Sequence, residues 1–187
     1  MPPVALCDAN ALYPAPVRDL LMWLGVNGII GLRWTERIMA EWVDNLLENR
    51  PDLDRDRLTR TCSEMNRAIP DALVSGYESV VETLTLPDAD DRHVLAAAIT
   101  AGADVLLTWN RRDFPATQLP RRMRVVSPDE FLDELFEVDA LRVLSSMSDH
   151  RRSLRRPAKS AEEYLATLAA NGLSRLVKRV RPMADEL

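Results

Sequence analysis

The chain opens with a short apolar run, residues 4–7, that stops at the carboxylate of Asp8. A short, continuous apolar run is typical of a buried strand in a parallel sheet. In open α/β sheets, ligands bind beyond the carboxyl ends of the strands, which is where Asp8 falls. We therefore predict that Asp8 holds a divalent metal ion. The alternative is that Asp8 only caps a turn, because Asp often makes local hydrogen bonds at strand ends.

Strands and helices alternate along the next part of the chain. Apolar runs predict further strands at 29–34, 104–108 and 124–126. Helical spacing of apolar residues predicts helices at 17–24, 35–48 and 91–101, with a charged, largely exposed helix at 54–68 and β-like pieces at 72–74 and 80–84. This alternation predicts an α/β domain over residues 1–128, in which helices cover both faces of a parallel sheet.

Residues 129–187 are expected to form a separate helical extension. The pattern predicts an amphipathic helix at 129–146, then a basic, proline-bearing linker at 150–159. Ser160 and Glu163 have the spacing of a capping box and should open a helix that ends at Ala170. A short helix at 173–180 completes the extension.

The composition is that of a globular protein, with 47% hydrophobic and 28% charged residues. No apolar run approaches the roughly 20 residues that span a bilayer, and the first residues do not have the pattern of a signal peptide. We therefore expect a cytoplasmic protein that does not enter a membrane. Cys7 and Cys62 have no spacing that suggests a disulfide or a metal site.

Charge is distributed unevenly in the extension. Residues 129–139 include six acids and no bases, whereas residues 142–181 include ten Lys or Arg against three acids. Such blocks are often only a solvated surface. The alternative is a patch that binds phosphates, which requires the basic residues to gather on one face.

Three further acids are placed where they could converge on Asp8. Glu41 lies in the helix at 35–48, Asp91 opens the helix at 91–101, and Asp113 follows the turn after the strand at 104–108. Carboxylates that gather in one place repel one another unless a cation neutralises them. A cluster of oxygen ligands without Cys or His suits Mg²⁺ or Mn²⁺.

The order of these motifs resembles the PIN-domain family, in particular the VapC-type ribonuclease toxins of bacterial toxin–antitoxin pairs. The resemblance covers most of residues 4–128 and depends on residues 7–10, Glu41, residues 90–98 and residues 108–114. The C-terminal helices resemble the extra domain of longer VapC-like toxins. The implied fold is a three-layer α/β/α sandwich around a central parallel sheet, with a C-terminal helical extension.

The resemblance implies an endoribonuclease that depends on Mg²⁺ or Mn²⁺. Its acidic set would be Asp8, Glu41, Asp91 and Asp113, with Asp8, Asp91 and Asp113 as the metal ligands. Thr108 and Asn110 would orient the carboxylates through hydrogen bonds. The implied partners are an RNA substrate, with tRNA as the first choice, a small antitoxin protein and a second copy of the chain.

The neighbours of Asp91 have less certain roles. We expect Asp90 to cap the following helix, which would leave Asp91 to point into the cleft. On a helix, His93 would lie about 200° around the axis from Asp91, so we expect it to be structural and to face away from the site.

Basic and aromatic side chains near the cleft have two interpretations each. Arg92, Arg111 and Arg112 could contact RNA phosphates or simply be surface charge. The tryptophans at 34, 42 and 109 could stack on bases, but we expect at least two of them to be core residues.

Three other classes of protein remain to be weighed. A dinucleotide-binding domain is disfavoured because neither G-x-G-x-x-G nor the P-loop motif occurs. A haloacid-dehalogenase-type phosphatase or a phospho-receiver also starts from a strand-end Asp, but it needs a second acid nearby and a core lysine. Here residue 10 is Asn, and the lysines are Lys159 and Lys178. The remaining alternatives are a housekeeping RNA-processing nuclease and a non-catalytic PIN-like binding module.

Overall fold

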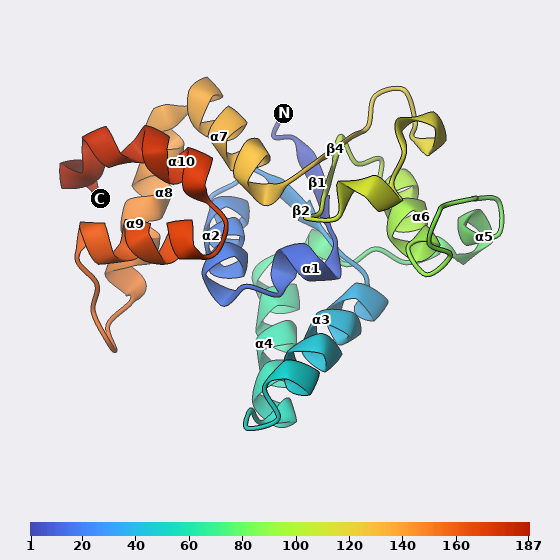
Figure 1. The fold of residues 1–187 in the computed structure, drawn as a ribbon, viewed down its shortest axis with the longest axis horizontal. Helices are drawn as coiled ribbons and strands as arrows, with labels where there is room; N and C mark the ends of the chain where they lie inside the picture. Colours follow the sequence, from blue (N-terminus) through green and yellow to red (C-terminus); the bar gives the residue numbers. More distant parts are fainter.

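A computed structural model describes all residues from 1 to 187. Its centre is a four-stranded parallel sheet with the strand order β2-β1-β3-β4 (Figure 1). The strands are β1 (Val4–Cys7), β2 (Gly31–Arg33), β3 (Val105–Leu107) and β4 (Arg124–Val126). The four predicted strands are therefore confirmed, although β2 is shorter than the apolar run that contains it.

Helices flank this sheet. They are α1 (Ala9–Leu12), α2 (Ala15–Val26), α3 (Glu36–Asn49), α4 (Arg55–Ala68), α5 (Glu78–Val81) and α6 (Arg92–Thr100). The chain moves from β1 to β2 in one direction and from β2 past β1 to β3 in the other. Because crossover connections are right-handed, this reversal puts α2 and α6 on opposite faces of the sheet (Figure 1). The predicted α/β class and layering are confirmed.

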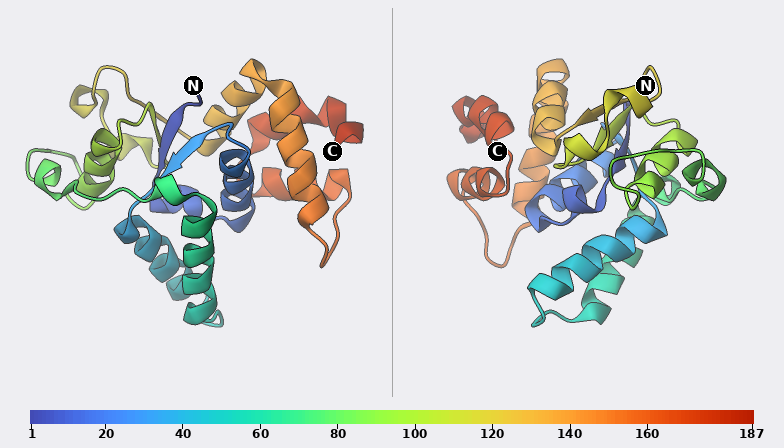
Figure 2. Two further views of the ribbon diagram at one scale, coloured as in Figure 1. Left: turned by 180° about the vertical axis from the view of Figure 1, so that it is seen from behind. Right: turned by 45° about the vertical axis from the view of Figure 1, so that its right-hand side comes forward.

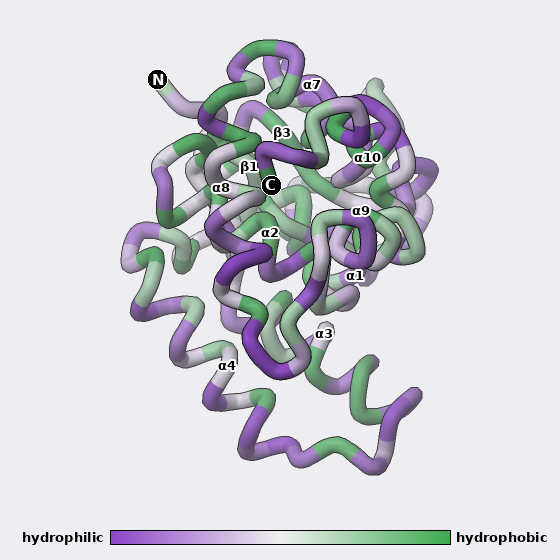
Figure 3. Tube along the Cα trace, turned by 90° about the vertical axis from the view of Figure 1, so that its left-hand side faces the viewer, coloured by the Kyte–Doolittle hydropathy of each residue, from purple (hydrophilic) through white to green (hydrophobic).

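The α3–α4 pair forms an arm that extends from the body (Figure 3). The Thr35 side chain caps α3 by accepting a hydrogen bond from the Ile38 amide at 3.0 Å. One face of α3 is buried, whereas Met65 is the only buried residue of α4. The prediction of a charged, largely exposed helix at 54–68 is confirmed.

Of the two β-like pieces predicted, one is wrong and the other is confirmed only in part. Residues 80–84 are not β-like, because Val80 and Val81 end the short helix α5 and have no strand beside them. Residue 73 makes only a single bridge to Trp34, between the one-turn helix Pro70–Ala72 and an irregular segment. In the 72–74 piece, Ala72 is buried, Leu73 is exposed and Val74 packs against the core, so this piece alternates as a strand does but pairs over one residue only.

The C-terminal segment contains four helices, α7 (Pro128–Val138), α8 (Ala140–Ser153), α9 (Ala161–Ala170) and α10 (Ser174–Val180). The single helix predicted at 129–146 is interrupted at Asp139, whose side chain accepts a hydrogen bond from the Arg142 amide and starts α8. Because α8 continues to residue 153, the linker is shorter than predicted. The capping box of Ser160 and Glu163 is confirmed.

These helices dock on the α2 side of the sheet, where α8 lies along α2 (Figure 2). The Asn27 side chain donates to the Ser146 hydroxyl at 2.7 Å across this contact. Buried apolar side chains of the sheet region and of α7–α10 form one continuous core. Within the segment, the buried carboxylate of Asp129 accepts hydrogen bonds from the backbone amides of Arg175 and Leu176 at 3.0–3.1 Å.

No helix combines the length and the apolar character that crossing a membrane requires.

Candidate active site

The carboxyl ends of β1 and β3 lie side by side at the centre of the sheet. The chain connections leave these two strands in opposite directions, so this is the topological switch point of the sheet. Asp8 follows β1 and Thr108 follows β3, and both side chains are buried. The local topology therefore brings together two polar residues that are 100 positions apart in the sequence.

Asp8 uses both carboxylate oxygens. Its Oδ1 accepts a hydrogen bond from the Ala9 amide at 2.7 Å, so Asp8 caps α1 as the alternative interpretation required. Its Oδ2 accepts from the Thr108 hydroxyl at 2.7 Å and from the side-chain Nδ2 of Asn10 at 2.6 Å. Burial raises the pKa of Asp8, against the effect of the hydrogen bonds from Thr108 and Ala9. Capping and a role in the site are thus compatible, because each uses a different oxygen.

Asn10 is the residue that the sequence analysis missed. Its Nδ2 contacts the Thr108 hydroxyl at 2.9 Å, and its Oδ1 accepts from the Trp109 amide at 2.9 Å. Asn10 therefore ties the start of α1 to the chain that leaves β3. The available signal was its place two residues after Asp8, which entered the family resemblance and the argument against other families but was given no role in the site.

Asp91 and Asp113 form the second part of the cluster. Asp113 lies near enough to Asp91 to influence its pKa. Burial, followed by the negative charges of Asp8 and Asp113, raises the pKa of Asp91 to about 7. The charges of Asp8 and Asp113 therefore both act on Asp91, and no Lys or Arg is among the groups that shift its pKa.

The expectation that Asp90 caps α6 is wrong. Asp91 occupies the position before the helix, and its side chain makes no capping hydrogen bond. Asp90 is exposed, and its backbone amide donates to Asp88 Oδ1 at 2.9 Å in a local turn. The helix starts one residue later than predicted, so Asp90 belongs to the preceding turn, in which Asp88 is the acceptor.

Glu41 reaches the same region from α3. Its Oε1 accepts from Arg37 Nε at 2.9 Å and lies 3.0 Å from Nε2 of the buried His93. Burial acts to raise the pKa of Glu41, but His93 and Arg37 outweigh it and hold that pKa below its usual range. The charge of Glu41 also acts on Asp8, so Glu41 belongs to the cluster.

The expectation that His93 faces away from the site is wrong. The separation of 200° applies only when both residues are helical, and Asp91 precedes the first turn of α6. His93 lies near enough to Asp8 to influence its pKa, and its Nδ1 is buried without a hydrogen-bond partner. His93 thus holds Glu41 from inside the fold.

The donor set fits a hard divalent cation in its chemistry. All four acids offer oxygen, which Mg²⁺ and Mn²⁺ prefer. The pKa of Asp91 is raised by burial and then by the negative charges of Asp8 and Asp113, which a cation would neutralise. As the side chains are arranged, no three Asp, Glu, His or Cys residues are close enough together to hold an ion. The cluster therefore has the required ligand type, but it is not a formed metal cage.

Comparison with known proteins identifies the fold around this cluster. A model described as "PIN domain" matches residues 5–112, which is more than half of the chain. The chain belongs to the PIN-domain family. A second model, "VapC50 C-terminal domain", matches residues 128–182 and so covers most of α7–α10. The predicted family and the longer form with C-terminal helices are therefore confirmed.

One relative of this PIN-domain chain is a Mycobacterium tuberculosis protein named "Putative ribonuclease VapC50". It is 32% identical over 101 residues, which are 50% of this chain and 59% of the relative. The chain thus spans less than two thirds of that relative's length. No solved structure matches the chain.

The remaining predicted residues of the PIN domain have mixed surroundings. The Asn110 side chain donates to Asp113 Oδ2. Arg92 Nε donates to the Ala89 carbonyl at 2.9 Å, and Arg111 pairs with Glu130 of α7 at 2.7 Å. Arg112 is exposed and makes no ion pair. Trp34 and Trp42 are core residues as expected, whereas 37% of Trp109 is exposed.

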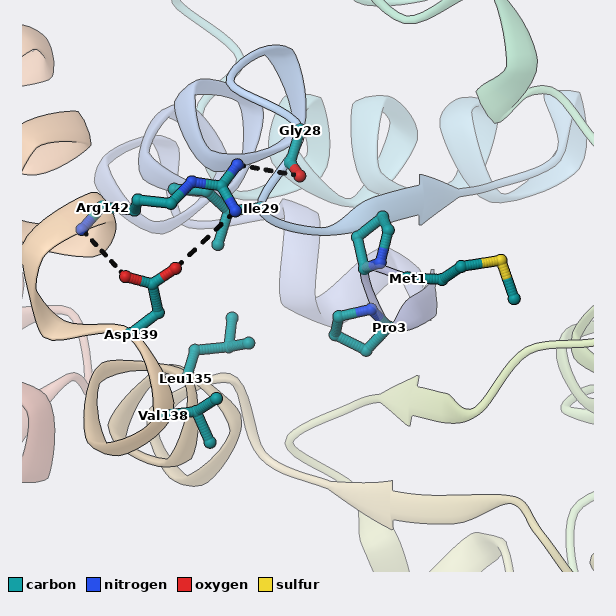
Figure 4. A pocket seen from close by; sticks show the side chains of 9 residues that line it. Met1, Pro3, Gly28, Ile29, Leu135, Val138, Asp139 and Arg142 are labelled. Atoms are coloured by element: carbon teal, nitrogen blue, oxygen red, sulfur yellow. Dashed lines mark hydrogen bonds and ion pairs between the residues drawn. The ribbon is translucent and has the colours of Figure 1, made fainter.

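A cavity of about 340 Å³ lies beside Pro3, at the start of β1 (Figure 4). Because Asp8 follows the other end of β1, the cavity lies at the opposite end of the sheet from the acidic cluster. Pro3, Ile29 and Leu135 contribute to its walls, and Arg142 crosses it to the Gly28 carbonyl at 3.3 Å. None of the four acids borders it. The cluster therefore lies at an open edge of the PIN domain, separate from this cavity.

Proposed function

We propose that this chain is an endoribonuclease that requires Mg²⁺ or Mn²⁺ and that the strand-end acids form its active centre. The observation that carries the proposal is the cluster of Asp8, Asp91 and Asp113: burial, followed by the negative charges of Asp8 and Asp113, raises the pKa of Asp91 to about 7. Membership of the PIN-domain family and a relative whose name includes "ribonuclease" support the reaction class.

In this proposal, Asp8, Asp91 and Asp113 hold the cation and Glu41 completes the acidic set. When bound, a divalent cation activates water for attack on a phosphodiester and offsets the negative charge of the phosphate. Thr108 and Asn10 keep the Asp8 carboxylate in one orientation, as their hydrogen bonds indicate. His93 and Arg37 do the same for Glu41.

Asn110 orients Asp113, and Asp90 stays outside the centre in the turn before α6. Arg92 and Arg112 are proposed to contact RNA phosphates at the rim. Arg111 is a weaker choice for such a contact than the sequence suggested, because its guanidinium is already paired with Glu130.

We further propose that the chain is the cytoplasmic toxin of a VapBC-type pair, with a small antitoxin as partner, a homodimeric state and tRNA as the substrate. The match of the C-terminal helices to a VapC50 domain supports this choice over a housekeeping RNA-processing nuclease. The division into a nuclease domain, residues 1–128, and an extension, residues 129–187, is part of the proposal.

The test is cleavage of bulk tRNA by the purified full-length chain with Mn²⁺, with Mg²⁺ and with EDTA. We expect defined fragments with either metal and intact RNA with EDTA, read on a denaturing gel. Cleavage that continues in EDTA would contradict the metal-dependent centre. A second experiment distinguishes a toxin from a housekeeping RNA-processing nuclease. The chain is expressed in a bacterial host without the antitoxin, where a toxin stops growth and a housekeeping nuclease does not.

A further inference from the structure

The chain that leaves β3 carries Asp113 and is attached to the rest of the molecule at both ends. At its start, the Trp109 amide donates to Asn10 Oδ1 at 2.9 Å. Asp113 ends the one-turn helix Arg111–Asp113. At its end, the side chain of Phe114, the residue after Asp113, is buried in the core. Between these two points, the position of the turn depends on what the side chains of Trp109 and Arg111 contact.

The first such contact comes from α7. Arg111 Nη1 lies 2.7 Å from Glu130 Oε2. Glu130 itself is immobilised, because its Oε2 also accepts from the Ser127 amide in the capping box of α7 and its Oε1 lies 3.3 Å from Arg175 of α10. Arg111 is thus attached to a carboxylate that two C-terminal helices hold in place.

The second contact comes from the turn between α9 and α10. A Cβ atom on Gly172 would lie 2.8 Å from Cη2 of Trp109, so only glycine allows the indole to approach this closely. The φ of Gly172 is +97°, a conformation that side chains with a Cβ rarely adopt. The turn is therefore shaped to receive the Trp109 ring.

The ion pair between Arg111 and Glu130 is expected to add little to the free energy of unfolding. Roughly half of the Arg111 side chain is exposed, and ion pairs between exposed side chains contribute about 0–1 kcal/mol. The pair lies two residues before Asp113, whereas the displacement of a catalytic group by about 1 Å can cost about 100-fold in rate. The ion pair between Arg111 and Glu130 is therefore expected to affect the position of Asp113 more than the stability of the fold.

We infer that the C-terminal helices position Asp113 for the nuclease centre, with Glu130 and Gly172 as positioning residues that act through Arg111 and Trp109. The helices contribute no carboxylate to the centre. This inference rests on the proposed function, and it assigns to the extension a role in activity that is separate from RNA binding.

The test compares Arg111→Gln and Glu130→Gln in the full-length chain with Arg124→Gln. The control removes a similar ion pair, Arg124 to Glu134 at 2.8 Å, which joins β4 to α7 away from the Asp113 loop. Gln at residue 130 keeps a capping-box residue type, so α7 should still start correctly.

We expect both test variants to lower kcat for tRNA cleavage about 10-fold and to weaken Mn²⁺ binding in calorimetry several-fold, with KM nearly unchanged. Arg124→Gln should leave all three values within about twofold, and Arg111→Lys should restore most of the loss. Because the two test residues act through one contact, the double variant should lose no more than either single variant.

Three results would overturn the inference or separate it from the proposed function. A raised KM with normal kcat and Mn²⁺ affinity would make Arg111 an RNA contact. Equal behaviour of all three Gln variants would make the contact merely structural. If the unmodified chain binds Mn²⁺ but cleaves no RNA, the proposed function fails while the Mn²⁺ measurements still decide the inference.

Discussion

The chain contains two groups of acids that differ in whether arginine side chains neutralise them and in the direction in which their pKa is shifted. In the α7 group, Glu130 and Asp133 pair with arginines, and both have a pKa below the usual range. In the strand-end group, Asp8 and Asp91 have a raised pKa and no arginine or lysine partner. Acids that the chain neutralises hold helices together, whereas acids that it leaves uncompensated are available to an external cation.

Glu41 lies between these two cases. It faces the strand-end group, yet His93 and Arg37 hold its pKa below the usual range. This arrangement keeps Glu41 ionised beside the buried Asp8. Asp8 and Asp91 therefore differ from Glu41, because the chain supplies cationic partners within ion-pair distance to Glu41 and none to the other two acids.

The largest expected effect is that of Asp8→Asn. We expect kcat for RNA cleavage to fall at least about 100-fold, because the cation contributes several kcal/mol to transition-state stabilisation. The matched change in the other group is Asp133→Asn, which breaks the pair with Arg179 and should leave kcat within about twofold. Circular dichroism should show both variants folded. Equal activity of the two variants would end the distinction between the groups.

The two histidines extend the comparison to stability. His150 is buried among α2, α8 and α9, where its Nδ1 contacts the Tyr164 hydroxyl at 3.0 Å, and burial lowers its pKa to about 4. The folded chain therefore favours neutral His150. Its stabilising effect is complete above about pH 6.5 and is lost as the pH falls from 6.5 to 4, with a limit of about 3 kcal/mol.

Urea unfolding between pH 7.5 and 4.5 checks this prediction. The unmodified chain should lose more unfolding free energy over that range than His150→Gln, because the variant lacks the group that must become protonated. Identical pH dependence in the two proteins would show that His150 is accommodated equally well in its charged form.

The other histidine should affect activity more than stability. His93→Gln replaces the rigid imidazole, whose Nε2 lies 3.0 Å from Glu41 Oε1, by a flexible side chain that holds Glu41 less firmly. We expect kcat and Mn²⁺ affinity to fall about 10-fold, as for other residues that orient metal ligands. His150→Gln at pH 7.5 is the control and should change neither value by more than about twofold. If His93→Gln behaves like this control, the bond to Glu41 has no part in the reaction.

The smallest expected effect concerns Asp91 in the metal-free chain. Its pKa of about 7 exceeds the ordinary 3.8, so its contribution to stability falls as the pH rises from about 4 to about 7. At pH 8, Asp91→Asn should raise the unfolding free energy by about 1 kcal/mol, a value discounted because the carboxyl is partly exposed. Mn²⁺ should raise the melting temperature of the unmodified chain more than that of the variant.

Features that depend on local patterns were predictable from the sequence. The buried strands, the caps at Thr35 and Ser160, and the exposed α4 follow from periodicity and side-chain type. The position of Asp8 at the sheet edge followed from one apolar run. Each of these predictions needed fewer than about 15 neighbouring residues.

The family resemblance suggested that the four acids converge, but individual contacts between distant residues were not predictable. Asn10 meets Thr108 only because β1 and β3 are neighbours, and His93 meets Glu41 only because α6 and α3 reach the same edge. The acidic and basic blocks of the extension were interpreted as a surface or a phosphate patch. In the structure, α7 and α10 instead use Asp133 and Arg179 to pair with each other.

The buried carboxylate of Asp129 has a consequence for how a chain of this type can be shortened. Two backbone amides of α10 satisfy it, so a truncation that removes α10 strands an anion inside the protein. Loss of the tail and replacement of residue 129 by an apolar residue should therefore occur together, whether in evolution or in the design of a minimal nuclease.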